Sequence, residues 1–278
     1  MNLGFFDALV RHTFLQYALL SGLLASVACG VVGTYVVARR ISYIAAGIAH
    51  SVLGGMGLAH YLAVVHGLTW LHPLHGAVVA ALASAVTIGF VSLKARQRED
   101  TVIGAIWAVG MAAGILFIAA TPGYQENLMS YLIGNILMVS GSDIRLLALL
   151  DVVVVIVCFL FYRQLSAVCF DEEFARVRGL AVGAYYILLL CLTALTVVLL
   201  VSVVGIILVI ALLTIPVAVA GRFTRTLWQT MLLAVGVSSV FTTLGLAVSF
   251  TPNWPAGPTI ILVAGVTFLA VSLVRGRG

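Results

Sequence analysis

Residues 185–215 read YYILLLCLTALTVVLLVSVVGIILVIALLTI, 31 consecutive positions without an Asp, Glu, Lys or Arg. A helix crosses the hydrocarbon core of a bilayer with roughly 20 residues. The run is therefore too long for one straight span, and we expect two helices, or one broken helix, around Gly205. A stretch this long and this apolar predicts a protein whose surroundings are lipid.

The composition extends this conclusion to the whole chain. Only 8% of its 278 residues are charged and 63% are hydrophobic, whereas soluble domains carry about 25% charged residues. The net charge of +5 is compatible with a nucleic-acid partner, but the basic residues stand at the ends of apolar runs, which is the positive-inside pattern. We therefore predict an integral membrane protein that binds no nucleic acid.

Other apolar runs of spanning length lie on both sides of this one. They cover residues 14–38, 42–65, 76–93, 101–120, 146–162, 227–250 and 259–273. With one or two helices from the 185–215 run, we predict an all-α, polytopic membrane protein of eight or nine transmembrane helices, in a single domain over residues 1–278. The shorter run 128–139 contains Gly134 and Asn135 and is predicted to be a re-entrant or interfacial helix.

Lysine and arginine predict the orientation. Basic clusters mark alternate loops, at residues 39–40, 94–98, 176–178, 222–225 and 275–277. Cytoplasmic loops carry the excess of Lys and Arg in membrane proteins. All five clusters are cytoplasmic if the C-terminus lies inside and the N-terminus outside the membrane.

Enzymatic motifs are missing from the sequence. It contains no G-x-x-x-x-G-K-[ST] loop for ATP phosphates, no H-E-x-x-H and no G-x-S-x-G. Asp151 is the clearest acidic residue at membrane depth, and we expect it in the first turns of the 146–162 span, near the interface. A proton-coupled carrier usually places ionisable groups near the midplane, so this shortage disfavours one.

His50 is the first feature that points to function. A histidine inside a spanning helix is costly and indicates a functional site, and neutral imidazole binds zinc and other first-row metals. Its neighbours at helical spacing are small, namely Gly47, Ser51 and Gly54, so this face would allow another backbone or a hydrated cargo to approach closely. A histidine that only hydrogen-bonds a neighbouring helix explains the residue equally well.

The loop 66–75 is the second feature. It carries His66, His72 and His75, and His60 ends the preceding helix. One interpretation is a metal-collecting relay on the extracytoplasmic side. The alternative is a polar loop with interfacial histidines, which the spacing favours slightly because it matches no structural zinc motif.

The third feature is the segment 170–180. Its acidic start, Asp171-Glu172-Glu173, suits a helix N-terminus, Arg176 and Arg178 suit the last turn, and Gly179 suits the cap. A short cytoplasmic helix of this kind is what a separate motor subunit would grip, although an ordinary inter-helix loop has similar chemistry.

The chain resembles the membrane subunits of metal-ion ABC transporters, the ABC-3 family. The resemblance rests on RRISYI (39–44) followed by GIAHS (47–51), on REDTVIG (98–104) and YLIGNIL (131–137), on Asp171 with Ala175 and Gly179, and on LLTIPVAVA (212–220) and PAGPTI (255–260). These segments occur in the family's order from about residue 22 to residue 274.

The resemblance implies a type II ABC importer permease for zinc, manganese or iron, not an enzyme itself. It implies two permease copies, a cytoplasmic ATPase dimer and an extracytoplasmic metal-binding protein, with the metal as cargo and no permanently bound cofactor. His50 would be the pathway histidine, and residues Asp171, Glu172, Glu173, Ala175, Arg176 and Gly179 would form the coupling helix.

The chain departs from the family at Ala46, where an aspartate commonly stands four residues before the pathway histidine. A replacement ligand would have to come from elsewhere, and Asn135 and His60 are the candidates. Since manganese prefers oxygen ligands, loss of the carboxylate favours zinc. A permease for a larger metal chelate and an ATP-independent secondary metal carrier are the alternatives.

Overall fold

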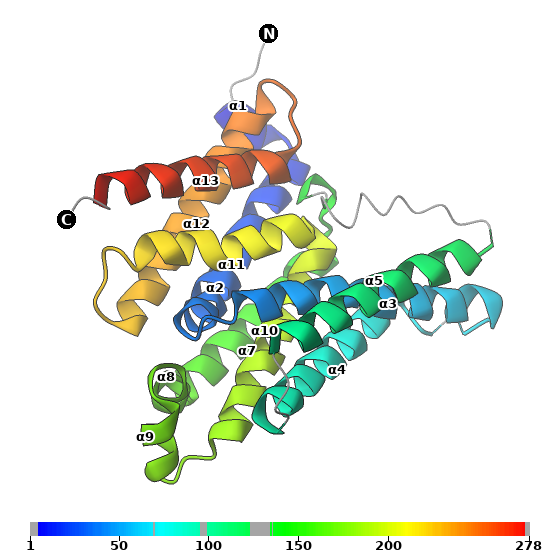
Figure 1. The fold of residues 1–278 in the computed structure, drawn as a ribbon. Helices are drawn as coiled ribbons and strands as arrows, with labels where there is room; N and C mark the ends of the chain where they lie inside the picture. The colour runs from blue at the N-terminus through cyan, green and yellow to red at the C-terminus, as the bar shows by residue number, and fades with distance from the viewer. Residues whose placement is uncertain (1–4, 69, 95–98, 123–133, 135, 276–278) are drawn as a thin grey trace.

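The computed structural model describes all residues except 1–4, 69, 95–98, 123–133, 135 and 276–278. Its described part contains helices and no strand (Figure 1). The elements are α1 (Phe5–Arg11), α2 (Thr13–Ala38), α3 (Ser42–Val65), α4 (Pro73–Lys94), α5 (Glu99–Ala120), the 3-10 turn η1 (Ile136–Met138), α7 (Gly141–Leu160), α8 (Tyr162–Phe170), α9 (Glu172–Val177), α10 (Val182–Val204), α11 (Ile206–Ala220), α12 (Leu227–Phe250) and α13 (Ala256–Arg275).

The predicted all-helical membrane fold is confirmed. Within the described residues, seven helices are long and apolar enough to cross a bilayer, namely α2, α3, α4, α5, α10, α12 and α13. The pair α7 and α8, bent by 74°, makes an eighth. The 15-residue α11 is shorter than the other spans, so the predicted count of nine is reached only if α11 crosses as well.

The long apolar run divides at Gly205, as its length predicts. Gly205 has φ 87°, a conformation that favours glycine because it has no Cβ. Gly134, with φ 67°, packs against this break: a Cβ on it would lie 2.2 Å from the backbone carbon of Val204. Of the run 128–139, residues 128–133 and 135 lie outside the described part, and residues 136–138 form the turn η1.

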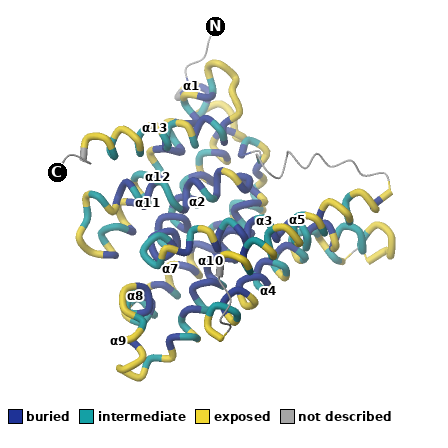
Figure 2. Tube along the Cα trace, in the orientation of Figure 1, coloured by how far each residue is buried: buried dark blue, intermediate teal, exposed yellow. Residues whose placement is uncertain are grey.

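Helices α2 and α10 form the centre of the bundle. In an 18-residue apolar stretch of each of these helices, 67% of the residues are buried. The corresponding shares are 11% for α5 and 17% for α13. Figure 2 shows the same contrast between the dark blue centre and the exposed outer helices. Because α5 and α13 expose their apolar side chains, their outer faces suit lipid or another membrane-embedded surface.

Helices α3, α4 and α5 extend together to one side of the bundle (Figure 1). A Cβ on Gly55 would lie 2.1 Å from the carbonyl oxygen of Gly76 on α4, and a Cβ on Gly54 would lie 2.8 Å from the carbonyl oxygen of Gly110 on α5. Glycine therefore permits backbone contact between α3 and both neighbours. Such close approach is how helices commonly associate in lipid.

Three local features differ from the sequence-based expectation. α1 was not predicted, and neither was α8, which continues the chain beyond a bend at Phe161. α7 begins at Gly141, five residues earlier than expected, because Ser140 and Asp143 form a capping box there. Asp151 is therefore the eleventh residue of α7 rather than part of its first turns, and it is buried.

Gly134→Ala should destabilise the protein. The left-handed backbone conformation costs a residue with a Cβ about 1–2 kcal/mol, and the contact with Val204 adds to that cost. We expect a lower midpoint of thermal unfolding in detergent. Gly236→Ala is the matched control because nothing lies within 4 Å of its added Cβ; equal midpoints for the two variants would contradict the packing of Gly134 on the break.

Candidate functional site

His50 lies in the third turn of α3 and faces α5. Its imidazole stacks on the indole of Trp107, with ring centroids 4.3 Å apart and an interplanar angle of 8°. The Nδ1 atom is buried and has no hydrogen-bond partner within the described residues. Trp107 in turn donates its Nε1–H to the Met111 sulfur at 3.1 Å. The imidazole therefore stacks on Trp107, and its Nδ1 is buried without a hydrogen bond among the described residues.

The small residues around His50 receive the backbone of α5. A Cβ on Gly110 would lie 2.6 Å from the Ser51 Cα, and a Cβ on Gly47 would lie 2.7 Å from the Ile103 Cγ2. Close approach of another backbone was one of the two roles predicted for Gly47, Ser51 and Gly54. Ala46 is half-buried one turn before His50, so no carboxylate stands at that position.

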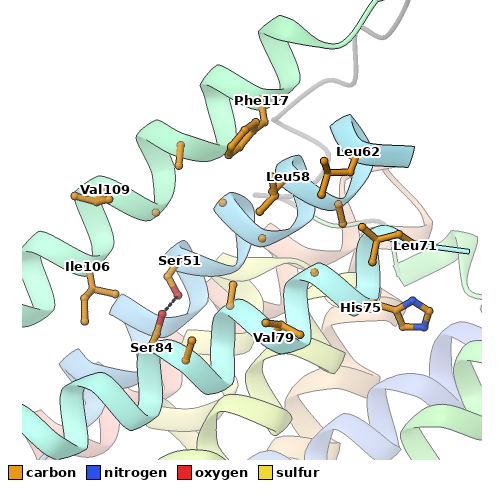
Figure 3. Close-up of a pocket in the computed structure, with 18 of the residues that line it drawn as sticks. Ser51, Leu58, Leu62, Leu71, His75, Val79, Ser84, Ile106, Val109 and Phe117 are labelled. Atoms are coloured by element: carbon orange, nitrogen blue, oxygen red, sulfur yellow. Dashed lines mark hydrogen bonds between the residues drawn. The ribbon is translucent and has the colours of Figure 1, made fainter. Parts of the chain in front are cut away.

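A cavity of about 820 Å³ opens between α3, α4 and α5. Figure 3 shows Ser51 at its inner end, where Ser84 donates a hydrogen bond to the Ser51 hydroxyl at 2.8 Å. Gly54 also lines the cavity, His75 lies at its rim, and most of the remaining wall is apolar. His50 and His60 are not among the lining residues. His50 and the cavity therefore represent two separate features of α3.

The three histidines of the predicted loop 66–75 are exposed, and His75 lies in the first turn of α4 because that helix begins at Pro73, three residues earlier than expected. The Nδ1 of His72 accepts the Leu74 backbone N–H, and the Nδ1 of His75 accepts the His72 backbone N–H, both at 3.3 Å. His66 meets the edge of the Tyr61 ring, and His60 is half-buried on α3. In the described part of the chain, no group of three or more His, Cys, Asp or Glu can hold a metal. The metal relay stays a prediction.

The segment predicted to couple to a motor subunit forms the six-residue helix α9. Asp171 caps its start by accepting the Phe174 N–H at 2.8 Å. Gly179, at φ 78°, ends it: its N–H bonds to the Arg176 carbonyl and the Leu180 N–H to the Ala175 carbonyl, which is a Schellman cap. Ala175 is buried, while Glu173, Phe174 and Val177 are exposed. The exposed surface of the helix therefore carries acidic and apolar side chains together with the basic Arg176.

An ion pair connects α9 to the turn between α2 and α3. Glu172 accepts a hydrogen bond from Arg39, which ends α2, and a second one from Arg176 at 3.2 Å. The Arg39 guanidinium also lies 5.4 Å from the centroid of the Tyr186 ring on α10. The pairing of Arg39 with Glu172 was not predicted from the sequence because the two residues lie 133 positions apart.

The bundle of membrane-length helices, with a histidine inside one of them and a short exposed helix at one end, is compatible with a membrane transport permease. The ABC 3 transport family matches residues 11–275. The chain therefore belongs to the ABC-3 family, which confirms the resemblance found in the sequence, and it is a permease subunit rather than an enzyme.

Its relatives agree with this assignment. An uncharacterised membrane protein of Synechocystis is 43% identical and aligns over 96% of this chain and 92% of its own length. A probable metal transport system membrane protein of Chlamydia pneumoniae is 38% identical, over 98% and 94%. The manganese transport system membrane protein MntC of Listeria monocytogenes is 33% identical, over 97% and 93%.

A solved structure has the same architecture. PsaBC from Streptococcus pneumoniae, determined in complex with a Fab, superposes with a TM-score of 0.84 at 30% identity, over 96% of this chain and 94% of the other. The ABC permease fold is therefore shared along nearly the whole length.

Gly54→Leu should separate α3 from α5. A leucine cannot fit where a Cβ alone would lie 2.8 Å from the Gly110 carbonyl oxygen, so we expect a lower unfolding midpoint and reduced recovery from size-exclusion chromatography. The control is Gly104→Leu on α5, where nothing lies within 4 Å of an added Cβ. Normal recovery of the Gly54 variant would show that this contact does not hold the two helices together.

Proposed function

We propose that this chain is the membrane permease subunit of an ATP-driven importer of divalent transition-metal ions, with zinc as its main cargo. The observation that carries the proposal is His50 inside a membrane span, with a buried Nδ1 that has no hydrogen-bond partner within the described residues. Membership in the ABC-3 family supports the transporter class. The names of the relatives from Chlamydia pneumoniae and Listeria monocytogenes support a metal as cargo.

The chemistry around His50 supports zinc over manganese. Manganese prefers carboxylate and other oxygen ligands, whereas zinc accepts imidazole nitrogen readily. The side chain at position 46 is a methyl group, and the neighbours on α5 are the indole of Trp107 and, next to it, the thioether of Met111. The name of the relative from Listeria monocytogenes favours manganese instead. The uptake experiment below distinguishes the two metals. Asn135 lies outside the described residues, and its proposed role as a ligand, like that of His60, stays a prediction.

In the proposed assembly, partner proteins bind at the two ends of the helix bundle. The exposed surface of α9 would dock on an ATPase dimer, and the 66–75 loop would face an extracytoplasmic metal-binding protein. A second copy of the permease would complete the pathway. The basic clusters support an N-terminus outside and a C-terminus inside a bacterial plasma membrane.

Substitutions at His50 and Ala46 test the cargo site. Radioactive zinc and manganese uptake is measured in cells that lack their own importers and express this chain with its ATPase and binding protein. We expect His50→Ala to reduce zinc uptake at least tenfold, since it removes a metal ligand. Ala46→Asp should raise manganese uptake relative to zinc, because it adds an oxygen ligand one helical turn from the imidazole.

The control for this test is His12→Ala, which removes an exposed histidine that precedes α2 and makes no side-chain cap there. Membrane levels of all variants are compared by immunoblot. Full zinc uptake by the His50 variant would remove that residue from the mechanism. Metal uptake by the permease expressed without its ATPase would show that the chain is a secondary carrier and not a subunit of an ATP-driven importer.

The ion pair between Arg39 and Glu172 gives a test of coupling. Arg39→Glu and Glu172→Arg should each reduce ATP-dependent uptake, and the double exchange should restore much of it, because the pair is re-formed with reversed charges. Arg40→Glu is the matched control, since Arg40 is exposed and adjacent. If the double variant is no more active than the single ones, the pair does not transmit motion between α9 and α3.

A further inference from the structure

Trp107 of α5 lies between two aromatic rings of α3. Tyr43 and His50 are two helical turns apart and therefore share one face of α3. The indole centroid of Trp107 lies 6.0 Å from that of Tyr43, at an interplanar angle of 48°, and 4.3 Å from that of His50, at 8°. Gly47 lies between the two rings, and a Cβ on it would already lie 2.7 Å from the Cγ2 of Ile103, one turn before Trp107. The indole therefore fits between the rings because α3 has no side chain at position 47.

The orientation of the indole is itself restrained. Its Nε1–H bonds to the Met111 sulfur, one turn further along α5, at 3.1 Å. Rotation of the Trp107 side chain would break this bond and would also change the contact with the Tyr43 ring. Trp107 is half-buried and does not belong to the buried apolar core. The residue therefore presents a flat face to His50 in a defined direction, beyond filling space between two helices.

The His50 ring is oriented without the hydrogen bond that is usual for a metal ligand. A histidine that binds a metal almost always donates its second ring N–H to a carboxylate, a backbone carbonyl or water, and that bond fixes the ring. The Nδ1 of His50 is buried and makes no such bond within the described residues. The contact that restrains the ring there is the nearly parallel indole of Trp107.

Stacking is compatible with metal binding by the same ring. A metal ion binds neutral imidazole at a ring nitrogen, along a lone pair that lies in the plane of the ring. A parallel partner covers one face of the ring and leaves this plane open. The interplanar angle of 8° between His50 and Trp107 therefore fixes the direction of the lone pair and does not block it.

We propose that Trp107 is a positioning residue of the metal site: its indole holds the plane of the His50 imidazole, in place of the hydrogen bond that usually does so. This inference rests on the proposed function, in which His50 is the metal ligand. A ring that is oriented before the metal arrives loses less conformational freedom on binding. The stacking contact therefore raises the affinity for the metal without adding a ligand.

The test measures zinc affinity of the full permease in detergent, by competition with a chromogenic chelator. Trp107→Leu keeps an apolar side chain but removes the flat face, and we expect it to weaken zinc binding roughly tenfold, as loss of a ligand-orienting partner does. Trp107→Phe keeps an aromatic face and should retain most of the affinity. Cobalt(II), whose open d shell quenches a nearby indole, should quench the emission of the unmodified chain, and excess zinc should restore it. The Trp107→Phe variant should lack this response.

Matched variants separate positioning from general packing. Trp228→Leu removes an exposed indole of α12 and should leave the zinc affinity unchanged. Met111→Leu removes only the acceptor of the indole N–H and should weaken zinc binding by a smaller factor, which supplies the test if Trp107→Leu does not fold. All affinities are measured on protein that elutes from size-exclusion chromatography like the unmodified chain.

His50→Ala distinguishes failure of this inference from failure of the proposed function. If His50→Ala loses zinc binding while Trp107→Leu binds zinc like the unmodified chain, the positioning role of Trp107 is wrong and the metal site stands. Equal losses in Trp107→Phe and Trp107→Leu would also overturn the positioning role, because the aromatic face would then not be what orients the ring. Zinc binding and cobalt quenching that persist unchanged in His50→Ala would instead contradict the proposed function.

Discussion

Contact between helix backbones at glycine holds α3 in place, and the candidate site depends on it. In lipid, two helices gain little by burying apolar side chains against each other because the acyl chains are equally apolar, so association depends on close packing. Gly55 meets Gly76 on α4, and Gly54 meets Gly110 on α5. With α3 fixed between two neighbours in this way, Trp107 of α5 is brought over the imidazole of His50. The geometry at His50 is thus a consequence of residues that carry no side chain.

The same constraint explains the break at Gly205. A helix that ends at membrane depth leaves carbonyl and N–H groups without partners, and irregular backbone is tolerated there only when other protein covers it. Gly134 lies against Val204 and Gly205 at a distance that excludes a Cβ. The break and its cover are therefore one feature, built from two glycines in left-handed conformations that lie 71 positions apart.

The spans could be predicted from the sequence because charged residues separate long apolar runs, and the split at Gly205 followed from length alone. The caps of α9 were predictable since Asp171 and Gly179 act through local hydrogen bonds. The bend that creates α8 could not be predicted, because no proline or glycine marks Phe161 and its neighbours. The stacking of His50 on Trp107 and the pairing of Arg39 with Glu172 depend on contacts between distant helices, which periodicity does not encode. The histidines at 66–75 could be located from the sequence, but the backbone hydrogen bonds that His72 and His75 accept depend on the local fold and could not be predicted.

Helix α3 connects the two ends of the proposed mechanism. Its first residue, Ser42, follows Arg39 by three positions, and Arg39 is bound to α9 through Glu172 and rests on Tyr186 of α10. His50 lies two turns further along the same helix. A rigid helix transmits a displacement at its start to residues within it, so a movement of α9 would shift the imidazole relative to Trp107. Among the described residues, no hydrogen bond at Nδ1 opposes that shift, whereas the stacking contact with Trp107 does. An aspartate at position 46 would add a second ligand that moves with the histidine, whereas in this chain the imidazole would bind and release the metal with a single nitrogen from this turn of the helix.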